Sequence, residues 1–103
     1  MSNQPFPKLI LYEGFGEREE WEMTKKGWFP AVVEVESGKR YEIRFYDPVR
    51  LLQEYTDTIR DGVPCFIEFN VIIVPEVTID AVRKSVQYLW EQKYFNFIQA
   101  EEK

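Results

Sequence analysis

Carboxylates are the most abundant chemically active side chains of this 103-residue chain. It contains 18 acidic residues, no histidine and a single cysteine, Cys65. The lack of imidazole and of paired thiolates excludes histidine-based acid–base catalysis, the usual catalytic triads and the common zinc sites. Glu34, Glu36 and Glu42 fall on one face of a predicted hairpin, where two of them could divide general acid and base roles. A solvated sheet face needs the same polar alternation, and we favour that interpretation because nothing marks a pocket around them.

Three other features of the sequence resemble sites but lack a required part. The acidic run 17–22 could hold a cation, yet it lacks the Asp-Gly spacing of a calcium loop. Gly14-Phe-Gly16 follows a short predicted strand, but the third glycine of a dinucleotide fingerprint is missing. Cys65 begins an apolar stretch without a histidine partner, so we predict a buried structural role. The sequence therefore predicts no cofactor, no metal and no catalytic residue, and it favours a protein that is not an enzyme.

Composition narrows the class of protein further. The net charge of −5 and pI near 4.8 disfavour nucleic acid as a partner and favour a basic protein partner or self-association. Lys39, Arg40, Arg44 and Tyr46 could form a small basic and aromatic surface, but the neighbouring glutamates would repel phosphate. The longest apolar run, 71–74, is too short to cross a bilayer, and residues 1–8 lack the apolar region of a secretory signal. With one free cysteine, these features predict a soluble cytoplasmic protein.

Alternating hydrophobicity gives the clearest local prediction, a β-hairpin. Valines alternate with glutamates over 33–36, and the alternation resumes over 41–46 after Ser37-Gly38. Placing Val35 opposite Ile43 sets Val33 beside Phe45 on the core side, and a one-residue slip would oppose Val35 with a glutamate.

Capping residues predict two helices that flank a strand. Asp47-Pro48 begins the first helix, whose apolar side carries Leu51, Leu52, Tyr55 and Ile59, and Gly62 ends it. The apolar stretch 65–74 is predicted as an inner strand that ends at Pro75. Thr78 caps the second helix, whose apolar arc comprises Ile79, Val82, Val86, Leu89, Trp90 and Phe97. Lys93 interrupts this arc, so we expect its buried part to end near Trp90. A short strand over 9–12 precedes the hairpin, and 17–22 is either one helical turn or irregular.

These elements occur in the order β-ββ-α-β-α. They predict an α+β fold, a small two-layer sandwich with an approximately four-stranded antiparallel or mixed sheet and two helices on one face. We expect residues 1–103 to form a single domain, with 1–7 as a flexible N-terminal lead-in.

Aromatic residues outside the predicted core are the best functional candidates. Trp21, Trp28 and Phe29 fall in a segment predicted to be irregular, and Tyr88 and Phe95 form a second stripe on the last helix. The main hypothesis is a non-enzymatic protein-interaction module, such as an adaptor, inhibitor or immunity-type binder, that forms a homodimer through the last helix. The alternative is a small-ligand site beside Trp21 and Trp28, with Arg44 or Lys26 binding an anionic group. A single-stranded nucleic-acid binder and a carboxylate-only enzyme remain as third hypotheses.

Overall fold

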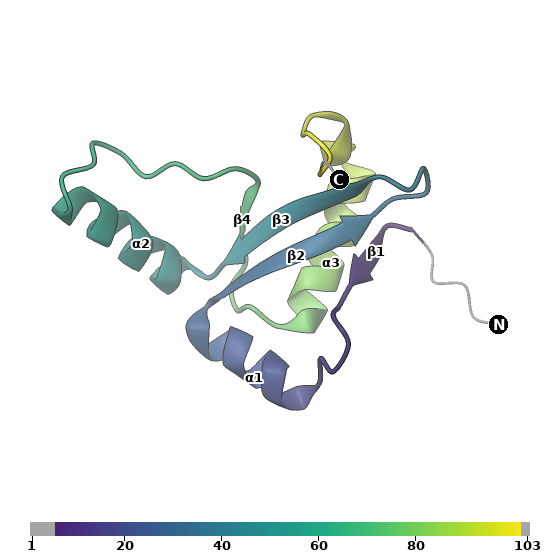
Figure 1. Cartoon of the computed structure of the whole chain (residues 1–103), viewed down its shortest axis with the longest axis horizontal. Coiled ribbons are helices and arrows are strands. Elements are labelled where there is room, and N and C mark those ends of the chain that lie inside the picture. Colours follow the sequence, from purple (N-terminus) through teal and green to yellow (C-terminus); the bar gives the residue numbers. More distant parts are fainter. Residues whose placement is uncertain (1–5, 102–103) are drawn as a thin grey trace.

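The computed structural model of the protein describes residues 6–101. Its elements are β1 (Lys8–Ile10), α1 (Glu17–Lys26), β2 (Trp28–Glu34), β3 (Arg40–Tyr46), α2 (Pro48–Arg60), β4 (Val71–Ile73), α3 (Ile79–Glu91) and the 3₁₀ turn η1 (Tyr94–Asn96). The strands form one sheet in the order β1-β2-β3-β4, antiparallel except for the parallel pair β3–β4 (Figure 1). The predicted α+β fold with a four-stranded mixed sheet is therefore confirmed. Except for Phe6 and Pro7, the predicted lead-in 1–7 lies outside the described residues.

The hairpin forms with the predicted faces but in a different register. Ile43 lies opposite Ala31, and Tyr41 lies opposite Val33, so the predicted pairing of Val35 with Ile43 is wrong by four residues. The turn is responsible, because Val35 N–H donates to the carbonyl of Lys39 at 3.0 Å and only three residues lie between these two. A slip of four residues preserves the side-chain alternation, so Val33, Val35, Tyr41, Ile43 and Phe45 are all buried, as predicted.

The segment that was expected to be one turn or irregular is a ten-residue helix, α1. Glu19 at its third position accepts a hydrogen bond from Gly16 N–H at 2.9 Å, and Gly27 ends the helix in the left-handed conformation at φ 73°. Acidic residues in the first turn and two lysines in the last turn complement the helix dipole. The prediction of an irregular tryptophan segment is therefore wrong, since Trp21 is on α1 and Trp28 and Phe29 begin β2.

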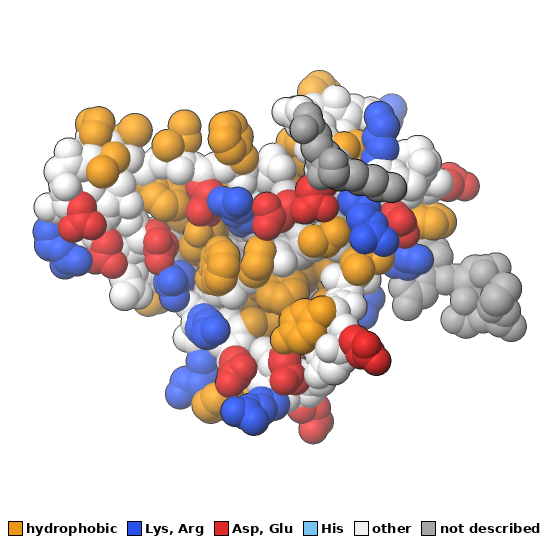
Figure 2. Space-filling view, viewed as in Figure 1, with side chains coloured by type: hydrophobic (Ala, Val, Ile, Leu, Met, Phe, Trp, Pro, Cys, Tyr) orange, Lys and Arg blue, Asp and Glu red, His pale blue; other side chains and the backbone are white. Residues whose placement is uncertain are grey.

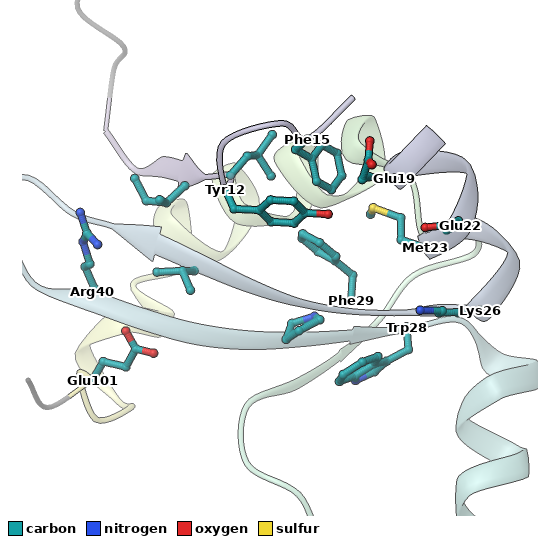
Figure 3. Close-up of a pocket in the computed structure, with 14 residues that line it drawn as sticks. Tyr12, Phe15, Glu19, Glu22, Met23, Lys26, Trp28, Phe29, Arg40 and Glu101 are labelled. Atoms are coloured by element: carbon teal, nitrogen blue, oxygen red, sulfur yellow. The ribbon is translucent and has the colours of Figure 1, made fainter. Parts of the chain in front are cut away.

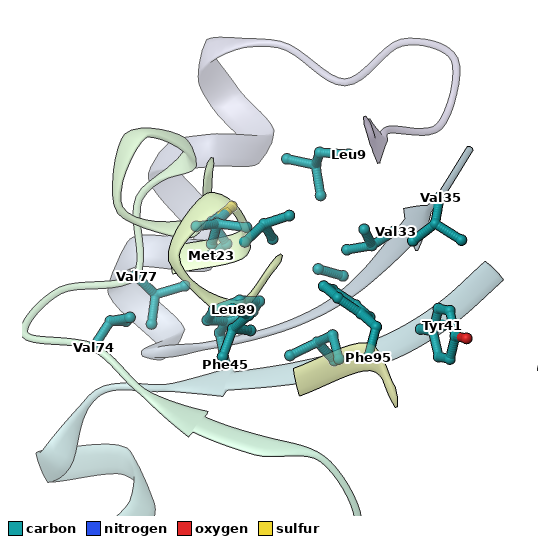
Figure 4. Packing of buried hydrophobic residues seen from close by; sticks show 14 residues of the cluster. Leu9, Met23, Val33, Val35, Tyr41, Phe45, Val74, Val77, Leu89 and Phe95 are labelled. Atoms are coloured by element: carbon teal, nitrogen blue, oxygen red, sulfur yellow. The ribbon is translucent and has the colours of Figure 1, made fainter. Parts of the chain in front are cut away.

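The core lies between one sheet face and helix α3. Val82, Val86 and Leu89 of α3 are buried, and Thr78 caps the helix by accepting from Ala81 N–H at 3.1 Å, as predicted. Helix α1 contributes Met23 to the same cluster of buried side chains (Figure 4). Its position is fixed by two contacts: Thr24 Oγ1 donates to the carbonyl of Val77, and Glu20 accepts from Ile79 N–H.

Helix α2 begins and ends as predicted but does not pack on the sheet. Asp47 accepts from Arg50 N–H at 2.7 Å, Pro48 is the first helical residue, and Gly62 follows the helix at φ 90°. None of its residues is buried. Figure 1 shows α2 projecting beyond the end of the sheet, with the segment 61–70 returning beside it. The two helices on the core side are therefore α1 and α3, and the expectation that α2 is one of them is wrong.

The predicted inner strand over 65–74 is also wrong in extent and position. Only Val71–Ile73 pairs, at the outer edge of the sheet, and Asn70 enters it with a left-handed φ of 57°. Cys65 is exposed, which contradicts its predicted burial. We call α2, the segment 61–70 that returns from it and the edge strand β4 together the arm (residues 48–73); all of it except β4 projects beyond the sheet. Of the helices within residues 6–101, none is long and apolar enough to cross a membrane.

Candidate functional site

The carboxylates of the outer sheet face are matched by cations. Glu34 lies 3.5 Å from Lys8 Nζ and 3.4 Å from Arg40 Nε. Arg44 lies 3.3 Å from Glu42 on the same strand and 3.1 Å from Glu68 in the segment that precedes β4. Partly exposed pairs of this kind contribute little to stability, yet Glu34, Glu42 and Glu68 each have a charged partner. Among residues 6–101, no three acidic or cysteine side chains gather closely enough to hold a metal ion.

Tyr46 is the one titratable group that this face buries deeply. Its hydroxyl donates to Glu68 Oε1 at 2.5 Å, and 3% of the residue is exposed. Burial raises the pKa of Tyr46, and the hydrogen bond and negative charge of Glu68 raise it further. Tyr46 therefore remains a neutral donor at physiological pH, and it attaches the segment 61–70 to the sheet.

The arm exposes most of the apolar surface that the fold leaves uncovered. Within residues 6–101, eight of the 14 large hydrophobic side chains that are exposed lie on it, namely Val49, Leu52, Tyr55, Ile59, Val63, Ile67, Phe69 and Ile73. In Figure 2, hydrophobic side chains project along the upper left edge, where Figure 1 places α2 and the segment that follows it. A concentration of this size is uncommon on a protein that functions alone.

An apolar groove runs along the arm between α2 and the returning segment. Its volume is about 530 Å³, and it is lined by Pro48, Leu51, Leu52, Tyr55, Pro64, Cys65, Phe66 and Ile73. No charged side chain lines the groove. The nearby charges of α2 are paired along the helix, Arg50 with Glu54 at 2.8 Å and Arg60 with Asp57 at 2.7 Å. The arm therefore presents apolar surface bordered by two ion pairs along α2.

A second cavity, of about 460 Å³, lies between α1, the loop before it and the first half of β2 (Figure 3). Tyr12, Phe15 and Phe29 form its aromatic wall, with ring centroids 5.4 Å apart for Tyr12–Phe15 and 5.9 Å apart for Phe15–Phe29. Met23 of α1 also lines it, and is 4% exposed. We call this cavity the β2-edge pocket.

The structure separates the six predicted site residues. Trp28 and Phe29 line the β2-edge pocket, whereas the Trp21 ring lies on the outer side of α1 beneath Lys25, 4.8 Å from Nζ. Arg44 belongs to the outer-face ion pairs and lines neither cavity.

The predicted stripe on the last helix does not exist. Tyr88 is 61% exposed, but the helix ends at Glu91, and Lys93 turns the chain with a left-handed φ of 61°. Phe95 then packs into the core, 5.1 Å from the ring of Tyr41, and is 5% exposed. Phe97 lies beyond Trp90, where we expected the buried part of the helix to end, and it is 82% exposed.

Comparison with protein-family models, with curated proteins and with solved structures finds no match for this chain. The two concave surfaces are therefore interpreted from their own residues.

Sequence reasoning missed the arm, although the sequence contains a pattern that indicates it. Ile67, Phe69 and Ile73 occupy one side of an extended stretch, and Leu52 and Tyr55 occupy one side of a helix. Both patterns were assigned to the core.

Proposed function

We propose that the protein is a non-enzymatic interaction module that forms a homodimer through its arm. The observation that carries the proposal is that α2 is amphipathic and yet has no buried residue. A helix of 13 residues is marginally stable in water on its own and normally depends on packing of its apolar face. Within the described chain nothing covers that face, so a partner molecule is the natural source of packing.

A second copy fits this surface because the arm carries both a groove and the side chains that could fill one. Ile67 and Phe69 project beside the groove and are 78% and 80% exposed. In a two-fold dimer the same patch serves both subunits, so projecting side chains of one copy must meet a recess of the other. The open edge of β4 lies next to the groove and offers unpaired backbone to the same partner.

The exposed area is adequate for such an interface. Taking roughly 150–200 Å² for each fully exposed large side chain, the exposed fractions of the eight arm residues sum to on the order of 800 Å². Each partner in a standard-size interface contributes about 800 Å². The pairing of the arm's charges within each copy also reduces repulsion between two acidic chains.

Sedimentation equilibrium of three variants tests this proposal. We expect the parent chain to dimerise and Leu52→Glu to weaken dimerisation at least tenfold, about 1.4 kcal/mol, because a carboxylate would be buried opposite apolar groups. Gln53→Glu is the matched control, since Gln53 is an exposed neighbour on α2 that does not line the groove. Tyr88→Glu tests the surface of α3 and should leave dimerisation unchanged. A parent chain that remains monomeric at about 100 µM, or dimerisation that Tyr88→Glu abolishes and Leu52→Glu does not, would overturn the proposal.

A further inference from the structure

The β2-edge pocket exists because β1 is shorter than the strand it pairs with. β1 ends at Ile10, opposite Val32, whereas β2 extends back to Trp28. The loop that follows β1 carries Tyr12 and Phe15 away from the sheet, and α1 returns the chain to the start of β2. The space beside the unpaired half of β2 is therefore enclosed by aromatic side chains and by Met23, without being filled by them (Figure 3).

This edge is poorly suited to binding another strand. Val35, just after β2, donates its N–H to the carbonyl of Lys39, just before β3. Odd-numbered residues of β2 therefore direct their backbone groups to β3, and even-numbered ones direct them to the β1 side. Pro30 is even-numbered and has no N–H to offer there. An added strand would lose one ladder hydrogen bond at the centre of the site. The pocket thus fits a compact ligand better than an extended peptide.

The charges at the α1 end of the pocket leave one group free. Glu19 accepts from Gly16 N–H, and Glu22 lies 3.7 Å from Arg18 Nε, so both carboxylates have partners. Lys26 lines the same end and forms no ion pair within the part of the chain that the structure describes. At the opposite end, Arg40 and Glu101 carry opposite charges, as Figure 3 shows.

We propose that the β2-edge pocket binds a small amphipathic carboxylate. The apolar body of the ligand, an aromatic or branched group, lies against Phe15, Phe29 and Met23, and its carboxylate pairs with Lys26. The volume of about 460 Å³ is within the range of roughly 300–1,000 Å³ for small-molecule sites. The site is distinct from the arm, and this inference does not depend on dimerisation.

Three naphthalene probes that differ only in their polar group test the proposal: naphthylacetate, naphthylethanol and naphthylethylamine. The readout is the ¹³C methyl resonance of methionine, because the chain contains only two methionines and Met23 is the one that lines the pocket. We expect naphthylacetate to shift the Met23 signal at the lowest concentration. Lys26→Met should weaken its binding about threefold to fivefold, the range of an exposed ion pair, and should leave naphthylethanol unaffected. Lys25→Met is the matched control, because Lys25 lies over Trp21 and does not line the pocket.

Each other outcome contradicts the proposal in a defined way. A preference for naphthylethylamine would show that the glutamates determine the charge of the ligand. Equal binding of all three probes would show an apolar site without carboxylate recognition. No shift of Met23 with any probe would show that the pocket is not a ligand site. Repeating the titration with Leu52→Glu separates this result from the arm, since that substitution lies outside the pocket and should leave naphthylacetate binding intact.

Discussion

Gly27 joins α1 to β2, and replacing it with alanine should be unusually destabilising. Its φ of 73° is left-handed, and a Cβ placed there would lie 2.5 Å from Asp47 Oδ2 and 2.8 Å from Asp47 Cγ. The same carboxylate caps α2 by accepting from Arg50 N–H, and Asp47 N–H donates to the carbonyl of Gly27 at 2.9 Å. The methyl group of alanine would therefore displace the cap of a second helix.

The expected loss combines two separable costs. A left-handed conformation costs an L-residue about 1–2 kcal/mol, and loss of an aspartate N-cap costs about 1 kcal/mol, so Gly27→Ala should lose about 2–3 kcal/mol. Gly38→Ala and Gly62→Ala are controls, because both glycines have a similar φ and no atom within 4 Å of an added Cβ. They should pay only the conformational cost of about 1–2 kcal/mol.

Urea unfolding followed by tryptophan fluorescence measures these differences in the free energy of unfolding. The decisive comparison is a double-mutant cycle with Asp47→Ala, which removes the clashing carboxylate. In that background Gly27→Ala should cost no more than the control substitutions. If Gly27→Ala is no worse than Gly62→Ala in the parent chain, or if its effect is unchanged when Asp47 is alanine, the reasoning is refuted.

Three further predictions follow from burial. The raised pKa of Tyr46 means that the folded state keeps the phenol proton above pH 10 while the unfolded chain loses it, so stability should fall as pH rises above about 10. Urea unfolding of Tyr46→Phe at pH 9 and 11 should show a smaller fall in stability than the parent chain. An identical pH dependence of the two proteins would contradict this prediction. Phe45→Ala in the fully buried core should lower the free energy of unfolding by about 3–5 kcal/mol. Phe69→Ala on the arm should change that of the dilute monomer by less than about 0.5 kcal/mol. Equal losses of stability in thermal unfolding would show that the arm is part of the core. Cys65 is exposed and should react with a thiol reagent in the native dilute protein as fast as in urea, and slow labelling would contradict this placement.

Local rules predicted the elements well where a side chain interacts with its own backbone. Asp47 and Thr78 cap their helices as expected, and alternation identified every buried position of the hairpin from Val33 to Phe45. The register of the hairpin was not predictable in the same way, because alternation fixes only whether the offset between the two strands is odd or even. The choice among allowed registers depends on the turn, where Gly38 at φ 92° permits a three-residue connection.

The candidate sites depended on packing that the sequence pattern does not encode. An amphipathic helix has the same periodicity whether its apolar side meets its own sheet or another molecule, so α2 was assigned to the core. Phe95 lies in the core and not on an exposed stripe because Lys93, which is not a glycine, adopts a left-handed conformation and turns the chain. The β2-edge pocket required knowing that β1 spans three residues while β2 spans seven.

The first turn of α2 is bound to the last turn of α1, since Arg50 Nη1 donates to the carbonyl of Lys26 at 3.2 Å and Asp47 N–H donates to that of Gly27. A helix of 13 residues is about 20 Å long and resists bending, so it acts as a lever with its pivot at these two carbonyls. Small changes of angle at the pivot become large displacements near Arg60. The direction of the arm therefore depends on these backbone groups at the start of α2 and on the attachment of its returning segment to the sheet through Glu68 and β4.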